Sequence, residues 1–235
     1  MKSSTFENFI DGHWQCPVGN LYLCRGGDCA TCPFGRVARA GGVDVAAACA
    51  AAAVALGDWQ RRGYAVRRVE LARLPGRIAD QAPARQGPDE TASRGVELTD
   101  AERVAAGLTD LVRGLPANGS SRPGMVVCPS AHAVARLVLD ADADILESCR
   151  RLLPLLYEGH SAVVLLLYQD ARRLPVRLLT MLALIAEHLP AGVLNVITGL
   201  GLEAGLALVR HPLAARAPRP MEPADPHRSA QIHAP

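Results

Sequence analysis

Three cysteines early in the chain have the spacing of a metal-binding loop. Residues 24–32 read Cys-Arg-Gly-Gly-Asp-Cys-Ala-Thr-Cys, and gaps of four and two residues are typical of plant-type [2Fe-2S] loops. A cluster needs four thiolates, and the nearby additions are Cys16 and Cys49, the latter inside an alanine-rich predicted helix. The set Cys16, Cys24, Cys29 and Cys32 suits tetrahedral zinc equally well by ligand count. We favour the alternative that these are free thiols, the usual state of cysteines in a reducing compartment.

A second candidate site is the glycine run Gly199, Gly201 and Gly205, which follows an apolar strand pattern and precedes a helix pattern. Glycines at such a turn let backbone amides approach a dinucleotide, because no Cβ stands in the way. The spacing differs from the ordinary fingerprint, since Gly205 comes one residue late and Ala204 stands in its place. The alternative, which we favour, is a tight turn that needs glycine dihedrals and close helix packing.

Composition excludes several classes of function. The 235 residues include 25 basic and 23 acidic side chains, and a net charge of +2 gives no footprint of a nucleic-acid binder. Lys2 is the only lysine, so the body of the fold has no lysine chemistry. The most apolar stretch, residues 162–168, is far shorter than the roughly 20 residues of a membrane helix, and the first residues do not resemble a signal peptide. We therefore expect a cytoplasmic protein that contacts neither membrane nor nucleic acid.

The first half of the chain predicts a hairpin and then helices. Asp11-Gly12 favours a two-residue turn between strands at 8–10 and 13–15. Helices are predicted at 43–59, at 66–79 with a break or kink at Pro75-Gly76, and at 99–112, with a loop over 81–94.

The second half alternates strand and helix patterns. Strands are predicted at 125–128, 134–139, 161–168 and 193–197, and helices at 144–157 (interrupted by Pro154), 175–188 and 202–209. This alternation indicates an α/β fold with a Rossmann-like parallel sheet and flanking helices. Residues 213–235 contain too many prolines for helix or sheet and predict a disordered tail.

One segment carries a specific family resemblance. Residues 188–205 read His-Leu-Pro-Ala-Gly-Val-Leu-Asn-Val-Ile-Thr-Gly-Leu-Gly-Leu-Glu-Ala-Gly. This resembles the aldehyde dehydrogenase segment in which Leu-Pro-x-Gly-Val-Leu-Asn-Val leads to Thr-Gly-x-Gly-x-x-x-Gly. Four other pieces fall in the family's order: Asn-Phe-Ile-Asp-Gly-His-Trp at 8–14, the helix ending in Trp59, Arg-Pro-Gly-Met-Val-Val at 122–127, and Arg-Leu-Leu-Pro-Leu-Leu-Tyr-Glu-Gly at 151–159.

The resemblance implies an incomplete aldehyde-dehydrogenase-like cofactor domain over residues 1–212, the amino-terminal half of the family. A hairpin and helices occupy 1–121 and the βαβ part occupies 122–212. Within it, Gly199, Gly201 and Gly205 would be the cofactor-binding residues.

The departures from the family pattern bear on activity. The family's Pro-Trp-Asn-Phe-Pro motif, whose asparagine stabilises an oxyanion, falls near Asp-Ala-Asp-Ala-Asp at 140–144, where aspartate opposes a developing negative charge. The family's Val-Val-Leu-Lys-Pro-Ser-Glu meets residues 163–170, which offer no lysine to the ribose. Beyond Pro212 the Phe-Thr-Gly-Ser strand and the catalytic glutamate and cysteine are not found, and the sequence places no base beside Cys128 or Cys149. We expect no catalytic residues and at most weak NAD(P) binding.

Three hypotheses follow. The first is a pseudoenzyme or gene remnant that binds a second copy or a full-length aldehyde dehydrogenase. The second is the NAD(P)-binding part of an oxidoreductase, converting an aldehyde to a carboxylic acid, that another chain completes. The third is a metal or [2Fe-2S] module built on the cysteine loop. The first hypothesis also predicts an unpaired sheet edge beside residues 193–197, which would promote association.

Overall fold

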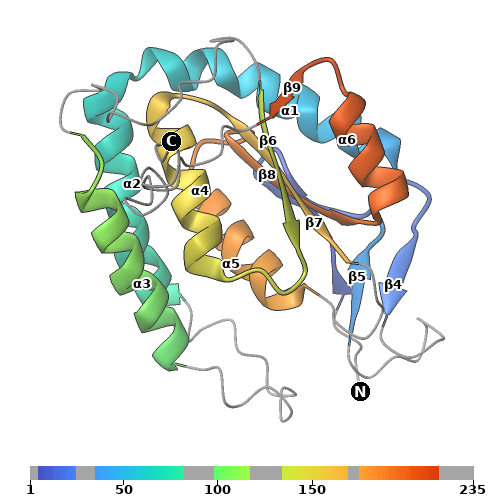
Figure 1. Cartoon of the computed structure of the whole chain (residues 1–235), viewed down its shortest axis with the longest axis horizontal. Helices are drawn as coiled ribbons and strands as arrows, with labels where there is room; N and C mark the ends of the chain where they lie inside the picture. The colour runs from blue at the N-terminus through green and yellow to red at the C-terminus, as the bar shows by residue number, and fades with distance from the viewer. Residues whose placement is uncertain (1–4, 25–34, 82–97, 117–133, 169–174, 217–235) are drawn as a thin grey trace, which may run out of the picture.

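The computed structural model describes residues 5–24, 35–81, 98–116, 134–168 and 175–216 (Figure 1). Their strands form two sheets. The larger has the order β3-β2-β8-β7-β6-β9, and the smaller has the order β1-β5-β4. The smaller sheet consists of β1 (Thr5–Phe6), β4 (Tyr22–Cys24) and β5 (Arg36–Ala38).

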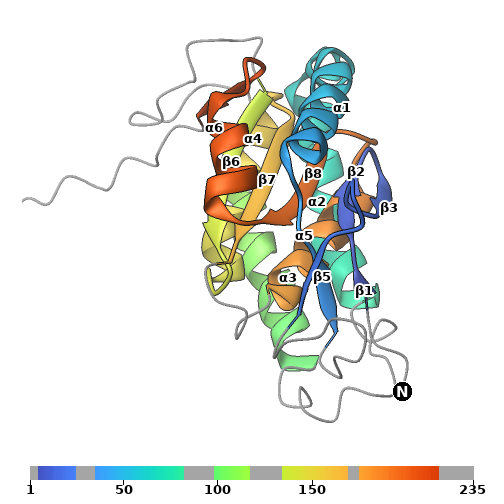
Figure 2. The same ribbon diagram turned by 90° about the vertical axis from the view of Figure 1, so that its right-hand side faces the viewer.

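The predicted hairpin is confirmed as β2 (Asn8–Ile10) and β3 (His13–Gln15), which pair antiparallel. The turn needs positive φ at two consecutive residues, and Asp11 and Gly12 adopt φ values of 53° and 78°. The hairpin docks on the larger sheet, where Phe9 lies opposite Val196 (Figure 2).

The centre of the larger sheet is parallel, as predicted. It is built from β6 (Val134–Asp140), β7 (Ala162–Leu167) and β8 (Leu194–Gly199). Both faces of β7 are buried, which explains its continuous apolar run. The predicted strand at 125–128 lies outside the described residues.

Two predictions about the edges of this sheet are wrong. The strand at 193–197 is not an edge, because β8 pairs with β7 on one side and with β2 on the other. The predicted disordered tail begins too early, because β9 (Ala214–Arg216) pairs in parallel with the first three residues of β6. The Phe-Thr-Gly-Ser motif is missing, yet Ala-Ala-Arg still forms a strand because the open side of β6 supplies hydrogen-bonding partners.

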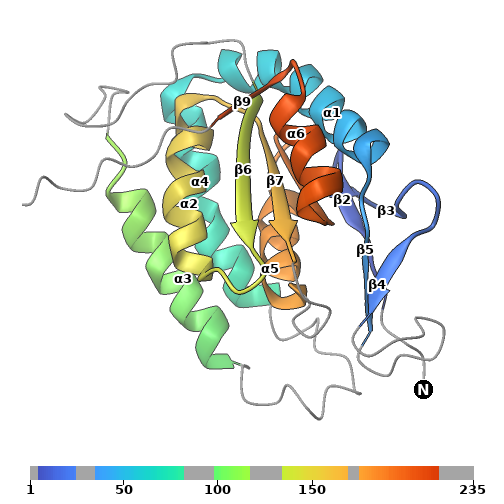
Figure 3. The same ribbon diagram turned by 45° about the vertical axis from the view of Figure 1, so that its right-hand side comes forward.

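Helices cover both faces of the sheet. On one face lie α1 (Gly42–Arg61) and α6 (Leu206–Arg210), packed against side chains such as Val163 and Leu165. The other face, which includes Val164 and Leu166, carries α2 (Gly63–Gln81), α3 (Leu98–Arg113), α4 (Ile145–Glu158) and α5 (Val176–Glu187). Figure 3 shows α6 and α4 on opposite sides of β6 and β7.

The predicted interruptions at two prolines are not found. α2 continues through Pro75 and α4 through Pro154, although a proline inside a helix costs about 3 kcal/mol. Tertiary packing compensates. The buried residues that flank these prolines are Leu71, Leu74 and Ile78 on α2, and Leu152, Leu153, Leu155 and Leu156 on α4.

A buried polar junction joins the helices at one end of the molecule. The Trp59 indole donates a hydrogen bond to the Leu156 carbonyl at 2.8 Å. The Arg67 guanidinium donates to the carbonyls of Tyr157 at 2.7 Å and Gln60 at 3.0 Å. Burial lowers the pKa of Arg67, and three backbone carbonyls, including that of Trp59, compensate for the lost hydration. The ends of α1 and α4 are therefore held by side chains from α1 and α2.

The helix α1 is long and apolar enough to cross a membrane by length and composition alone, the one such helix within the described part of the chain. The prediction considered only residues 162–168 and overlooked it. In the structure, α1 packs on the sheet through Val45, Ala48, Cys49 and Ala52, as a core helix does.

Truncating Trp59 should test the junction. Trp59→Ala should lower the free energy of unfolding by about 3–5 kcal/mol, because it removes a fully buried ring and leaves the Leu156 carbonyl without its donor. Trp14→Ala is the control, with an expected loss of about 1–2 kcal/mol because that ring is 36% exposed. Urea denaturation followed by circular dichroism measures both, and equal losses would contradict the role given to the junction.

Candidate functional site

The three candidate glycines meet at the carboxyl end of β8. Gly199 ends the strand, and Gly201 and Gly205 bound a single π-helical turn, η2 (Gly201–Gly205), that continues into α6. The Leu200 carbonyl accepts hydrogen bonds from the N–H groups of Glu203 and Gly205, both at 3.2 Å. The structure therefore places the sequence-predicted residues in one strand-turn-helix unit.

Of the three glycines, Gly199 alone has a packing reason to lack a side chain. A Cβ on Gly199 would stand 2.6 Å from the Ala204 Cβ and 3.2 Å from the Ala40 carbonyl oxygen, so close packing excludes it. A Cβ on Gly205 would meet Leu167 at 3.6 Å, an ordinary contact. A Cβ on Gly201 would meet nothing within 4 Å. Because none of the three has positive φ, packing rather than a left-handed dihedral explains Gly199, which corrects the expected turn geometry.

Sequence reasoning missed the segment that crosses this end of the sheet. The Ala38 carbonyl accepts hydrogen bonds from the hydroxyls of Thr198 at 2.5 Å and Tyr168 at 3.4 Å. Ala40 donates its N–H to the Thr198 carbonyl at 2.9 Å. The link between β5 and α1 therefore closes one side of the glycine turn.

Arg39 on this link holds the acidic residue of the turn. Its Nε donates to Glu203 Oε2 at 2.9 Å, and a second guanidinium nitrogen contacts Oε1. The hydrogen bond from Arg39 lowers the pKa of Glu203, and the same bond raises that of Arg39. Glu203 thus stays an anion bound to arginine. No local sequence signal marks this pair, which joins residues 164 positions apart.

The carboxyl end of β7 is apolar and aromatic. Leu166 is fully buried in the core, and Tyr168 follows the strand with only 2% of its surface exposed. No amine projects from this end of the strand, where the resemblance calls for a ribose-binding lysine. In addition, Glu203 is already bound by Arg39. The described residues at these strand ends therefore do not fit tight dinucleotide binding.

The acidic segment after β6 serves the fold. Asp144 is the N-cap of α4, where its carboxylate accepts a hydrogen bond from the Glu147 N–H at 3.0 Å. An arginine from α3, Arg103, lies 3.8 Å from the same carboxylate. Asp140 and Asp142 are exposed. The strand β6 leads directly into this segment, and the match at 122–127 lies outside the described residues.

The structure tests the cysteine hypothesis only in part, because Cys29 and Cys32 lie outside the described residues. Cys16 is exposed and Cys24 is buried at the end of β4. Within the described ranges, no three histidine, cysteine or acidic side chains gather as a metal site would require. The metal-site hypothesis remains a prediction.

The buried thiols of Cys49 and Cys149 are not activated. Desolvation raises the pKa of Cys49 to about 11 and that of Cys149 to about 12. A thiol needs a lowered pKa or an adjacent base to act as a nucleophile near neutral pH. Neither cysteine therefore offers a reactive thiolate.

The chain is similar in sequence to known proteins. No protein-family model matches the chain. Acetaldehyde dehydrogenase 2 of Cupriavidus necator is 30% identical over 224 residues, which cover 88% of this chain and 42% of that protein. An aldehyde dehydrogenase of Vibrio cholerae is 29% identical over 217 residues, which cover 86% and 41%. The chain is a partial homologue of the aldehyde dehydrogenases.

Solved structures of aldehyde dehydrogenases and related proteins share the fold. HpcC from Thermus thermophilus superposes with a TM-score of 0.65 at 21% identity, covering 91% of this chain and 42% of HpcC. PnpE in complex with nicotinamide adenine dinucleotide gives a TM-score of 0.65 at 22% identity, covering 90% and 45%. The chain thus spans less than half the length of these four proteins. The aldehyde dehydrogenase resemblance and the α/β fold are confirmed.

Two alanine substitutions compare the closely packed Gly199 with Gly201, which has open space around it. Gly199→Ala should destabilise the aldehyde dehydrogenase homologue by about 1–3 kcal/mol, because Ala204 or the Ala40 backbone must move. Gly201→Ala should change stability by less than about 0.5 kcal/mol, because its Cβ enters open space. Thermal and urea unfolding of both variants measures the difference, and equal effects would contradict the packing assigned to Gly199.

Proposed function

We propose that this chain is an aldehyde-dehydrogenase-like protein that does not oxidise aldehydes by itself and works by associating with another polypeptide. The partner is a second copy or a full-length aldehyde dehydrogenase. We also propose that this chain is cytoplasmic. One observation carries the proposed lack of activity: carboxylates occupy the segment after β6.

The acidic segment opposes the chemistry of the family. Aldehyde oxidation through a thiohemiacetal develops negative charge on oxygen, and donors must face that charge. Asp140 and Asp142 present exposed carboxylates, and Asp144 is committed to the N-terminus of α4. Acceptors therefore stand where the resemblance places a donor.

The residues at the ends of β7 and β8 support weak cofactor affinity. The described residues at the end of β7 supply no amine for a ribose, and Glu203 of the glycine turn is bound by Arg39. Of the three glycines, Gly201 leaves open space that a dinucleotide could approach. We expect an NAD(P) affinity no better than millimolar, about −4 kcal/mol.

Turnover and binding assays test this part of the proposal. The purified chain should produce no NAD(P)H from acetaldehyde or a longer aldehyde above a buffer control, while Cupriavidus necator acetaldehyde dehydrogenase 2 serves as the positive control. Calorimetry should show no NAD binding tighter than millimolar. Turnover above background, or micromolar NAD affinity, would end this interpretation.

Association is supported by an exposed apolar surface on α6 and its flanks. Leu202, Leu206, Val209 and Leu213 are exposed by 90%, 40%, 51% and 43%. Leu206 and Val209 are three residues apart on one face of α6, Leu202 lies on the preceding turn η2, and Leu213 follows the end of α6. We call these residues the α6 stripe. Apolar surface of this kind on a folded domain is a common feature of interaction sites.

The open edge of the sheet adds a second contact surface. β9 pairs with β6 only at residues 134–136, so the described strands leave the outer side of β6 unpaired from Leu137 to Asp140. An unpaired strand edge is a template for pairing with another chain. The α6 stripe and this edge belong to neighbouring elements, since β9 follows α6.

Light scattering of three proteins tests association. The chain at tens of micromolar should form a dimer or a larger assembly, and Leu202→Ser/Val209→Ser should shift it toward monomer. Val43→Ser/Val54→Ser is the matched control, because these valines are exposed on α1 and should leave the assembly unchanged. A sharp monomer near 24.9 kDa with cooperative unfolding would remove the physical basis for the partner-binding proposal.

The open space at Gly201 favours a second candidate function. In it, the chain is the NAD(P)-binding part of an oxidoreductase that another polypeptide completes. Mixing the chain with a full-length relative distinguishes the two, because this candidate requires added aldehyde oxidation and the first requires only complex formation.

A further inference from the structure

A basic pocket lies at the opposite end of the sheet from the glycine turn. It has a volume of about 260 Å³. The residues that line it are Arg62, Glu70, Arg73, Arg77, His188 and Pro190. His188 and Pro190 precede β8, whereas Gly199 ends it. A six-residue strand spans about 20 Å, so the pocket is separate from the site described above.

The core fixes the orientation of this pocket. Glu70, Arg73 and Arg77 follow the i, i+3, i+7 spacing that places side chains on one face of α2. Other residues of the same helix, Leu71, Leu74 and Ile78, are fully buried against the core. The arginines are therefore held at the surface by a helix that cannot rotate without exposing three large apolar side chains.

The pocket has an excess of positive charge. Three guanidinium groups face one carboxylate, and that carboxylate, Glu70, forms an ion pair with Arg62. Arg73 and Arg77 have no carboxylate within ion-pair distance among the described residues. Two arginines thus remain available to an anion.

Side chains rather than backbone amides would supply the recognition. Pro190 has no N–H group, and the His188 N–H already donates to the Ile185 carbonyl at 3.2 Å. Planar guanidinium groups suit the tetrahedral oxygens of phosphate, to which they donate paired hydrogen bonds. The volume is just below the usual range of about 300–1,000 Å³ for small-molecule pockets, which favours a small ligand.

We propose that this pocket binds a phosphate group, either as free phosphate or as the head of a small phosphomonoester. The two arginines without carboxylate partners match the charge of about −1.5 to −2 that a phosphate ester carries near pH 7. The proposal does not depend on dehydrogenase chemistry. Phosphate binding could therefore persist even if the chain proved to bind NAD tightly.

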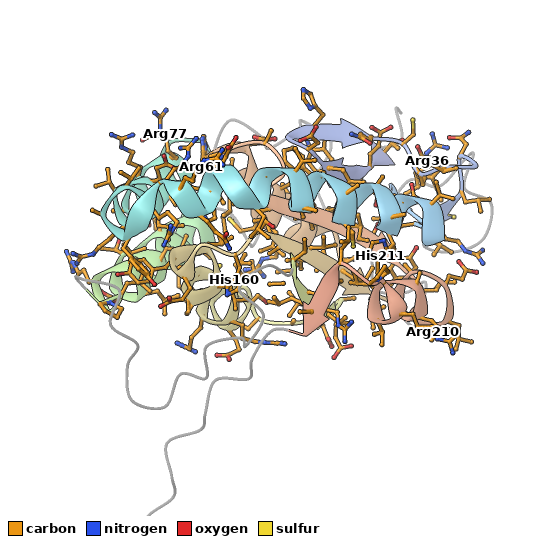
Figure 4. All side chains as sticks on the ribbon, turned by 90° about the horizontal axis from the view of Figure 1, so that it is seen from above. Arg36, Arg61, Arg77, His160, Arg210 and His211 are labelled. Atoms are coloured by element: carbon orange, nitrogen blue, oxygen red, sulfur yellow. The ribbon has the colours of Figure 1, made fainter. Side chains whose placement is uncertain are left out.

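Calorimetric titration of the whole chain tests this site. The probes are sodium phosphate and glycerol 3-phosphate, each at constant ionic strength and pH 7. The pocket variant is Arg73→Gln/Arg77→Gln. The matched control is Arg113→Gln/Arg210→Gln, which removes two exposed positive charges elsewhere, and Figure 4 shows Arg210 at the opposite end of the molecule from Arg77.

We expect at least one probe to bind saturably to the original chain and the control, and at least tenfold more weakly to the pocket variant. Binding of both probes assigns recognition to the phosphate group alone, and binding of glycerol 3-phosphate alone assigns it to a monoester. Circular dichroism should show the same fold for all three proteins, since the four arginines are exposed. Saturable binding by neither probe, or an equal loss in the control, would overturn the proposal.

Discussion

The hydrogen bonds at the junction of α1, α2 and α4 are the constraint on which the helix layers depend. α1 begins over one face of the sheet, and its last turn reaches the core of the other face through Trp59. Where α1 passes from one face of the sheet to the other, the backbone carbonyls at the end of α4 need hydrogen-bond donors. Trp59 and Arg67 satisfy them, and Gly159 leaves room, because a Cβ there would stand 3.2 Å from the guanidinium carbon. This junction positions α2 and therefore the basic pocket.

The two ends of the sheet have opposite characters. At the carboxyl ends of the strands, polar groups are used internally: Thr198 and Tyr168 bond to Ala38, Arg39 binds Glu203, and Asp144 caps α4. At the other end, arginines of α2 remain available. The polar groups at the carboxyl ends of the strands are thus bound within the fold, whereas Arg73 and Arg77 at the other end have no ion-pair partner among the described residues.

The sequence was sufficient where structure is local. The Asp11-Gly12 turn, the alternation of strand and helix, and the parallel centre of the sheet all follow from patterns within a few residues. Long-range pairing decided the rest. β8 gained an antiparallel neighbour from the amino terminus, β9 formed from Ala-Ala-Arg because β6 offered an open side, and packing carried two helices through proline. The Arg39–Glu203 pair left no sequence signal, because its members are distant in the chain.

The pairing of β2 with β8 has a consequence for the order of folding. Asp11 bonds to the Asn195 side chain across 184 residues, and Asn8 accepts from Thr198 across 190. Such contacts close very large loops, which slows folding. During synthesis at ~5–20 residues per second, the first hairpin waits roughly 10–40 s before its partner strand exists. The ribosome therefore synthesises the chain as far as β8 before the first hairpin can find its place in the sheet.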